Sequence, residues 1–479
     1  MQYQIIFIVQ FGGNNSMKPI ILDSDNSNKE FLYIQLYEAI RDDILSGAMS
    51  AGEKLPSLRG LSSELGISVT TIGQAYDQLL VEGYIISKPQ SGYYVAQVNS
   101  GKDSPSDRAP RAAEKLIDYT VEEPDYLYDL NCFDFGKWKK CAAKVFNDYS
   151  RLLLFESDPQ GEPALRYEIS RYIYRFRGVN AHPDNIVIGA GTQQITSHLS
   201  RILTKMDIHH VSLEAPGYLP VQSMFRDGGF TVSHIPVASD GIDIGRLPAN
   251  ISSAVYVSPS NQFPTGAVMP AGRRYQLLDW ANDNNSIIIE DDYDSELRYF
   301  GKPVPAMQGL DKNNRVVYLG SFSSTLFPAV KISYMVLPDE MAEIFRSIKS
   351  QYTQTCSKSE QLTLALFMEE GHYYTGIRKL RSLYSQKLQA AVSAFTKYGG
   401  DMVRALDTQS GINLTLKIRS RKTAEELCTD ARALGLHMVP LSEITDQETS
   451  ALIFYYNQIP LEKINDLIKQ VVENWIFTY

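Results

Sequence analysis

Between residues 30 and 97 the hydrophobic residues recur with the spacing of amphipathic helices. In 31–47 the apolar positions fall four apart and so share one helix face: Leu32, Leu36, Ile40 and Ile44. Two further helices are predicted at 56–66 and 68–83, where glycines mark the ends and Ser68 the N-cap. Residues 84–96 form two short runs of β-branched and aromatic residues around a Pro-Gln-Ser-Gly turn, which predicts a β-hairpin.

Three helices followed by a hairpin are the layout of a winged helix-turn-helix. In that layout the third helix enters the major groove of DNA, and the hairpin contacts the flanking backbone. The alternative is a small helical packing domain, because amphipathic helices alone are common. The order and lengths of the elements favour the winged helix.

From about residue 120 the pattern changes to short apolar runs that alternate with helical segments. The runs have the length and composition of buried parallel strands: 185–191, 210–217, 253–260, 286–294 and 315–324. Gly, Ser, Asp and Tyr follow them, as expected where an α/β sheet builds a ligand site. Further apolar runs at 412–418, 435–441 and 451–456 predict a small mixed subdomain at about 380–479. We therefore expect a large three-layer α/β domain over 120–479.

The segments outside these two domains are polar. Residues 98–119 are rich in Ser, Pro, Asp and Lys and predict a flexible linker. Residues 1–29 are interpreted as an N-terminal extension. Because Met17 opens a stretch that reads like a natural start, 1–16 are either a misassigned start or a frayed tail.

Composition narrows the class of protein. The net charge is −9, so nucleic acid must be contacted through a local patch. The four cysteines have no CxxC spacing, which argues against zinc and against a secreted disulfide framework. No metal is expected. The apolar run near the N-terminus is too short for a signal peptide or a membrane span. A soluble, cytoplasmic protein without membrane contact is expected.

The stretch "LPSLRGLSSELGISVTTIGQAYDQLLVEGYI" (55–85) resembles the GntR-type winged helix over its whole length. The resemblance implies that Arg59 contacts a phosphate or a guanine edge and that the start of the third helix and the wing tip also contact DNA: Ser68, Thr70, Thr71, Ser91 and Gly92. Val69 stands where the family usually has arginine. Residues 31–95 also carry four basic against seven acidic residues, so we expect weak binding per domain unless the protein dimerises.

Six segments of the large domain resemble fold-type I, pyridoxal-phosphate-dependent aminotransferases in order and spacing. They are "SDPQGEPALRYEISRYIYRFRGV", "IVIGAGTQQ", "EAPGYLP", "VSPSNQFPTGAVMP", "IIIEDDYDSELRY" and "GSFSSTLFPAVKISYMVLP". The chain from about residue 20 to the end resembles the MocR/GabR-like regulators, which fuse a GntR-type winged helix to an aminotransferase-like domain.

This resemblance implies a set of cofactor-binding residues. The glycine-rich turn after a strand would hold the phosphate through backbone N–H groups of Gly191, Thr192 and Gln193. Tyr218 is placed like the family's ring-stacking aromatic residue, and Asp291 like the carboxylate that keeps the pyridine nitrogen protonated. Tyr293 would bind the ring oxygen, and Lys331 matches the phosphate-binding arginine. The other candidates are Asn261, Ser321, Ser323 and Ser324.

The position of the covalent anchor departs from the family. The family's Schiff-base lysine stands 33 residues after the aspartate, and Asp291 plus 33 is residue 324, a serine. A hydroxyl cannot condense with an aldehyde to form an imine. Two further changes agree: Gln458 stands where related regulators have a carboxylate-binding arginine, and Leu219 and Pro220 replace basic residues.

The sequence thus indicates a DNA-binding, homodimeric regulator of the MocR/GabR type. Its aminotransferase-like domain is expected to be catalytically inactive and to bind pyridoxal phosphate, its amine form or another phosphorylated ligand without a covalent bond. Three alternatives stay open. The protein is an active aminotransferase with an appended helix-turn-helix domain, or an architectural repressor without a ligand, or Ser324 is an engineered substitution.

Overall fold

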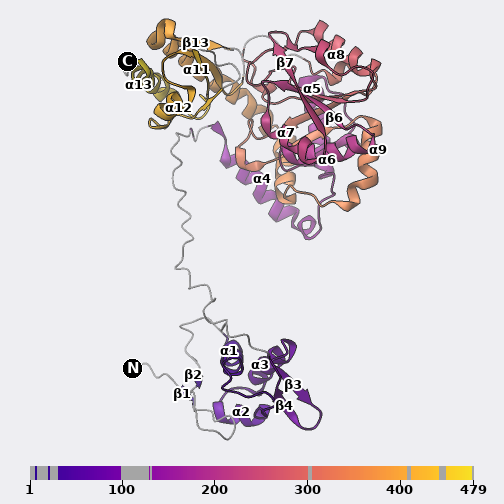
Figure 1. Cartoon of the computed structure of the whole chain (residues 1–479), viewed down its shortest axis with the longest axis vertical. Helices are drawn as coiled ribbons and strands as arrows, with labels where there is room; N and C mark the ends of the chain where they lie inside the picture. Colours follow the sequence, from indigo (N-terminus) through magenta and orange to yellow (C-terminus); the bar gives the residue numbers. More distant parts are fainter. Residues whose placement is uncertain are drawn as a thin grey trace. The chain divides into compact units, whose positions relative to one another are not determined.

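The computed structural model describes residues 6–7, 20–21, 31–98, 129, 132–299, 305–406, 411–441 and 449–476. The chain divides into two compact units, Met1–Thr120 and Val121–Tyr479 (Figure 1). The predicted extension at 1–29, apart from one short strand pair, lies outside the described residues. So does the predicted linker at 98–119, apart from residue 98.

The first unit contains the predicted winged helix-turn-helix. Its elements are α1 (Leu32–Leu45), α2 (Leu58–Leu65), α3 (Val69–Val81), β3 (Ile85–Lys88) and β4 (Gly92–Val95). Strands β3 and β4 pair antiparallel as the hairpin. Two short strands, β1 (Ile6–Phe7) and β2 (Ile20–Ile21), also pair antiparallel.

Local signals explain where the helices of this unit begin and end. The Ser68 hydroxyl accepts a hydrogen bond of 3.1 Å from the Thr71 amide, which caps α3 as predicted. Gly66 ends α2 in the left-handed conformation with φ of 63°, where other residues are strained. One face of α1 packs on α3 in the core of the unit, where Leu36 and Ile40 are fully buried with Tyr76.

The second unit is built on an eight-stranded sheet in the order β5-β12-β11-β10-β9-β6-β7-β8. The strands are β5 (Ile186–Gly189), β6 (His210–Ala215), β7 (Thr231–Ala238), β8 (Gly241–Ile242), β9 (Ala254–Val257), β10 (Ile287–Asp291), β11 (Val316–Ser321) and β12 (Ser333–Val336). Strand β12 is antiparallel to both of its neighbours, and β9, β10 and β11 are mutually parallel. The five strands predicted from sequence, β5, β6, β9, β10 and β11, therefore run in one direction.

Helices cover both faces of this sheet, which gives the predicted three layers (Figure 1). One face packs against α6 (Thr192–Lys205), α7 (Leu219–Asp227) and α9 (Asp339–Ile348). The other packs against α4 (Phe135–Asp148), α5 (Pro163–Arg177), α8 (Ala271–Asp283) and α10 (Lys358–Glu369). Successive strand residues alternate between the two cores, since Val187 belongs to one and Ile186 and Ile188 to the other.

The long helix α11 (His372–Gly399) leads into the C-terminal subdomain. There a four-stranded antiparallel sheet has the order β13-β14-β16-β15. Its strands and helices are β13 (Val403–Leu406), β14 (Leu414–Arg419), α12 (Ala424–Arg432), β15 (Met438–Pro440), β16 (Thr449–Phe454) and α13 (Ile464–Ile476). No helix among the described residues is long and apolar enough to cross a membrane.

Candidate functional site

A cavity of about 450 Å³ lies at the carboxyl edge of the large sheet. Because the five predicted strands run in one direction, the residues that follow them meet at this edge. The lining includes Gly191, Thr192, Gln193, Tyr218, Asp291, Tyr293, Ser321, Ser323, Ser324 and Lys331. These are all of the sequence-predicted cofactor residues except Asn261, which is buried close to Gly411.

One end of the cavity is suited to an oxyanion. Helix α6 starts there at Gly191, whose φ is 89°, and no side chain caps its first turn. Backbone N–H groups at such a helix start attract anions. Ser321 lies beside them and accepts hydrogen bonds from the Ser333 hydroxyl at 3.0 Å and from the Ser323 amide at 3.4 Å. Lys331, which also lines the cavity, adds a positive charge to these donors.

Buried acids lie in another part of the lining and next to it. The Tyr256 hydroxyl donates a hydrogen bond of 2.6 Å to Asp291, and burial raises the pKa of Asp291 to about 7. No lysine, arginine or histidine among the described residues lies within 4.0 Å of this carboxylate. Glu214 is close by; burial raises its pKa to about 8, and the charge of Asp291 adds to the shift. A cationic group in the cavity would relieve the cost of ionising Asp291.

Ser324 faces a second buried acid, Asp294. Burial raises the pKa of Asp294 to about 6, and the nearby Ser324 hydroxyl offsets part of that rise. The Oδ1 atom of Asp294 is buried and has no hydrogen-bond partner among the described residues. An unpaired carboxylate oxygen of this kind is costly unless a donor reaches it. Asp294 therefore brings an unpaired buried acceptor to the lining that also contains Ser324.

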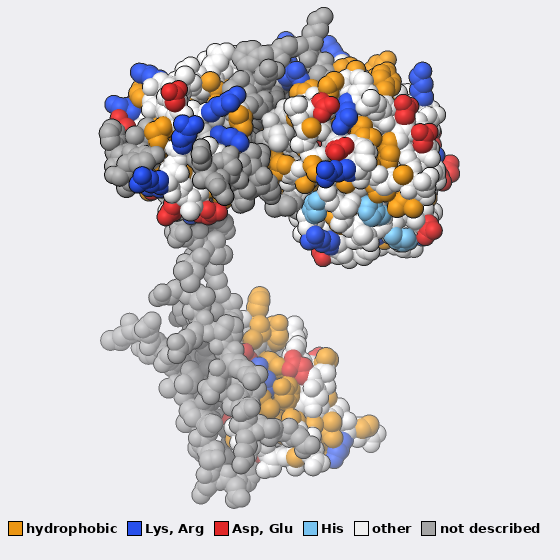
Figure 2. Space-filling model, turned by 45° about the horizontal axis from the view of Figure 1, so that its top comes forward, with side chains coloured by type: hydrophobic (Ala, Val, Ile, Leu, Met, Phe, Trp, Pro, Cys, Tyr) orange, Lys and Arg blue, Asp and Glu red, His pale blue; other side chains and the backbone are white. Residues whose placement is uncertain are grey.

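The predicted DNA-contacting residues lie on the surface of the first unit. Arg59 on α2 is exposed, as are Ser68 and Thr70 at the start of α3. Thr71 is half-buried, and its hydroxyl lies 2.8 Å from the Ser68 hydroxyl. Val69 adds an apolar side chain that is 43% exposed at the helix start. The face of this first unit that is in view in Figure 2 shows more hydrophobic than basic side chains.

The wing contributes cations that the sequence prediction left out. Ser91 is exposed at the turn, next to the half-buried Gly92, and its hydroxyl lies 2.6 Å from that of Tyr94. The Lys88 ammonium stands 4.4 Å from the centre of the Tyr94 ring, and that of Lys54 stands 5.8 Å from it. Lys88 belongs to β3, while Lys54 precedes α2 and is bridged to Tyr94. Both charges thus lie beside the hairpin, where a phosphate backbone is contacted in winged helices.

Comparisons with known proteins agree for both units. Residues 32–95 match the model of bacterial regulatory proteins of the gntR family, and residues 122–450 match aminotransferase class I and II. The chain is 38% identical to the HTH-type transcriptional regulator YdeL of Bacillus subtilis, over 86% of this chain and 89% of YdeL. It is 32% identical to the probable rhizopine catabolism regulatory protein MocR of Rhizobium meliloti, over 88% of each chain. This chain belongs to the MocR-type transcriptional regulators.

Solved structures show the fold of the larger MocR-type domain. An archaeal alanine:glyoxylate aminotransferase superposes with a TM-score of 0.65 at 20% identity, over 74% of this chain and 90% of that enzyme. A multiple substrate aminotransferase from Thermococcus profundus gives 0.64 at 23% identity, over 74% and 92%. At these identities the likeness extends to the fold alone.

Several lining residues of the MocR-type cavity were missed from sequence. They are Ala190, Phe263, Asp294, Ser333, Ile412, Asn413 and Tyr455. Ile412, Asn413 and Tyr455 come from the C-terminal subdomain, next to the ends of β14 and β16. Tyr455 lines the cavity, while Gln458, singled out in that segment, is not among the lining residues. The Leu219 side chain lies outside the described residues, and Pro220 is in the first turn of α7.

One cluster outside the cavity has metal-binding residue types. Ligand atoms of Cys141, Glu370 and His372 lie within 4.8 Å of one another. The Lys144 ammonium already pairs with Glu370 at 3.2 Å. Burial raises the pKa of Cys141 to about 11, and the charge of Glu370 adds to it, so the thiol stays protonated. A protonated thiol and a competing ammonium make this a poor metal site.

Proposed function

We propose that this MocR-type protein is a ligand-responsive transcription regulator whose aminotransferase-type domain senses a small molecule and does not catalyse amino transfer. The observation that carries the proposal is Ser324, which lines the cavity together with Asp294. A serine there cannot form the covalent bond on which this cofactor's enzymes depend. Lys331 is the single lysine among the described lining residues, and we assign it to the phosphate.

The residues present fit pyridoxal phosphate or its amine form as a non-covalent ligand. The start of α6 with Ser321, Ser323 and Lys331 would hold the phosphate. Asp291 would pair with a protonated ring nitrogen, Tyr293 would bind the ring oxygen, and Tyr218 would stack on the ring. When bound, the group supplies a protonated ring that accepts electrons. The buried Asp291 without a cationic partner supports this assignment.

Asp294 favours the amine form over the aldehyde. Its Oδ1 is a buried acceptor without a partner among the described residues, on a side chain that lines the cavity together with Ser324. An ammonium group would donate to it, whereas an aldehyde oxygen would face it as a second acceptor. We therefore expect pyridoxamine phosphate to bind more tightly than pyridoxal phosphate.

The protein would act as a homodimer on DNA. Hydrophobic side chains are exposed on α4 and in the segment that follows it: Phe146 is 58%, Leu154 82% and Phe155 65% exposed. Large exposed apolar side chains close in sequence are typical of an interface, and a second copy of this chain is the proposed occupant. Binding in the cavity would shift the relative populations of dimer arrangements and thereby the spacing of the two winged helices.

The test compares wild type with Ser324→Lys and Lys331→Gln. Wild type mixed with pyridoxal phosphate should stay without a protein-bound visible absorbance band, while Ser324→Lys should turn yellow. Calorimetry should show tighter binding of pyridoxamine phosphate to wild type. A borohydride-reducible band in wild type that Lys331→Gln removes would show that Lys331 is the anchor and the proposal is wrong. No binding of either form would remove the cofactor assignment.

A further inference from the structure

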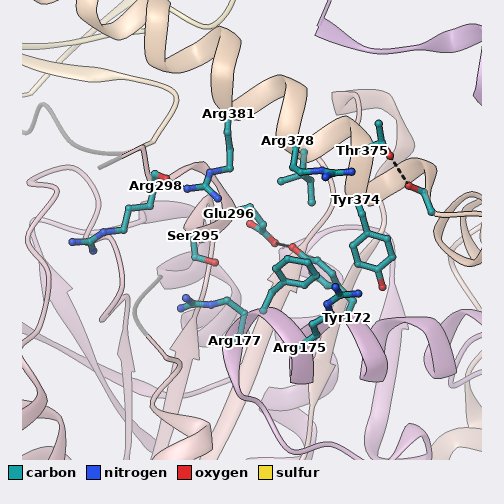
Figure 3. Close-up of a pocket in the computed structure, with 13 residues that line it drawn as sticks. Tyr172, Arg175, Arg177, Ser295, Glu296, Arg298, Tyr374, Thr375, Arg378 and Arg381 are labelled. Carbon is teal, nitrogen blue, oxygen red and sulfur yellow. Dashed lines mark hydrogen bonds between the residues drawn. The ribbon is translucent and has the colours of Figure 1, made fainter. Parts of the chain in front are cut away.

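A second cavity, of about 430 Å³, lies in the aminotransferase-type domain and shares no lining residue with the first. It is formed by the end of α5, by the segment after β10 and by the first turns of α11 (Figure 3). Asp294 lines the first cavity, and the next residue, Ser295, lines the second. The two cavities are therefore adjacent but separate.

Arginine dominates the charged lining of this second cavity. Five of its lining residues are arginines: Arg175, Arg177, Arg298, Arg378 and Arg381. Arg177 is neutralised by Asp292 through contacts of 2.6 and 2.9 Å. Figure 3 shows the Arg298 guanidinium directed away from the centre. Arg175, Arg378 and Arg381 remain.

These three arginines have no carboxylate within 4.0 Å among the described residues. Arg381 donates a hydrogen bond of 2.7 Å to the backbone carbonyl of Arg298, so its side chain is fixed against that part of the lining. Arg175 and Arg378 reach toward Tyr374 from its two sides (Figure 3). The only acid in the lining is Glu296, which accepts a 2.6 Å hydrogen bond from the Tyr172 hydroxyl. Burial raises the pKa of Glu296 to about 7, so near neutral pH it carries about half of a negative charge and leaves the lining positive.

The remaining lining is aromatic and aliphatic. The rings of Phe176 and Tyr374 stack with centroids 5.5 Å apart, and Tyr172 lies 5.2 Å from Phe176. Phe176 is 41% exposed, although it is a large apolar side chain in a concave surface. The Ser295 hydroxyl is buried and has no hydrogen-bond partner among the described residues. The Arg175 guanidinium stands 5.6 Å from the centre of the Phe176 ring. Cations without a carboxylate partner and an unbonded hydroxyl beside an exposed aromatic wall are the features of a ligand site.

We propose that this cavity binds a small aromatic or hydrophobic organic anion, a phosphate monoester or a dicarboxylate. Arg175 and Arg378 would hold the anionic group, and the apolar body would lie against Phe176 and Tyr374. Guanidinium groups suit both kinds of anion, because their planar N–H pairs match two oxygens at once.

The binding test uses the full-length protein in low-salt calorimetry with phenyl phosphate and phthalate. These compounds share a benzene ring and differ in the anionic group, so the two titrations distinguish phosphate from dicarboxylate. The double variant Arg175→Gln/Arg378→Gln should lower the affinity about tenfold or more. Both arginines are exposed, so the variant should fold normally, which an unchanged melting temperature without ligand would verify.

Two control variants test whether the ligand binds in this cavity. Lys379→Gln removes an exposed positive charge from the same helix, next to Arg378 but outside this cavity, and should leave the affinity unchanged. Lys331→Gln removes the cation of the first cavity and should also leave it unchanged. If wild type binds neither compound, or if Lys379→Gln weakens binding as much as the double variant, the proposal is wrong. Loss in Lys331→Gln alone would place the ligand in the first cavity and would also overturn it.

The aromatic wall has a test of its own. Phe176→Leu should weaken phenyl phosphate while leaving inorganic phosphate unaffected. An equal loss for both ligands would contradict the proposed contact with the ring.

Discussion

Replacing Asp291 with asparagine should stabilise the aminotransferase-type domain while weakening its ligand site. The Asp291 side chain is buried and accepts the Tyr256 hydroxyl at 2.6 Å. Burial is the main cause that raises its pKa, and the nearby charges of Asp292 and Asp294 add to the shift. Asparagine keeps an acceptor for Tyr256 but carries no charge, so the variant isolates the cost of ionising this group.

The size of the effect follows from the pKa shift. The pKa rises from 3.8 to about 7, and each pKa unit corresponds to about 1.4 kcal/mol. When folding raises the pKa of an acid, that acid destabilises the folded state at every pH above its unfolded-state pKa. The penalty grows as the pH rises and becomes constant above the folded-state pKa. Asp291→Asn should therefore gain at most about 4 kcal/mol above pH 7, about half of that near pH 5.5, and almost nothing near pH 4.

The assay is urea unfolding followed by tryptophan fluorescence between pH 5 and 8. All three tryptophans, Trp138, Trp280 and Trp475, lie in the second unit, so the signal reports that unit alone. Asp279→Asn, at an exposed position on α8, is the matched control and should show no such pH-dependent gain. Destabilisation at every pH, or a gain that does not change with pH, would refute the reasoning. The same variant should bind pyridoxamine phosphate less tightly.

Two further predictions concern the core and the DNA-binding unit. Arg177→Met removes the ion pair of the buried Asp292 carboxylate and should lower the free energy of unfolding by about 3–5 kcal/mol. The double variant Arg177→Met/Asp292→Leu should recover part of this loss, because no buried charge then remains without its partner. Equal losses in both variants would contradict direct pairing. Arg59→Gln should weaken binding to any DNA duplex, measured by fluorescence anisotropy, and should lower the number of counterions released on binding by about one. The control Lys397→Gln, at an exposed position on α11, should change neither quantity.

Elements with a simple hydrophobic pattern could be predicted from the sequence. The five parallel strands are buried on both faces, so each reads as a continuous apolar run between polar turns. Strand β12 was missed because it follows Lys331 closely and inserts antiparallel between β5 and β11. Strand β7 was missed because His234 and Pro236 interrupt its apolar pattern.

The candidate site could be predicted only where the sequence places its residues after strands. Tyr455 and Asn413 reach the cavity from the C-terminal subdomain, and nothing in their local sequence relates them to Asp291. Asp294 was missed for another reason. It adopts a left-handed conformation with φ of 54°, which breaks the alternation of side chains after β10. Its position depends on the turn, which the run of acids does not specify.

That turn explains how one short segment serves two cavities. Asp291, Tyr293 and Asp294 line the first cavity, while Ser295 and Glu296 line the second. Asp292 lies between these residues in the sequence and binds Arg177, which also lines the second cavity. A ligand that contacts Asp294 in the first cavity and a ligand that contacts Ser295 in the second therefore both affect the conformation of the same short segment. If both proposed sites bind, their affinities should be coupled through this segment, and by thermodynamic linkage each ligand must change the affinity of the other by the same factor.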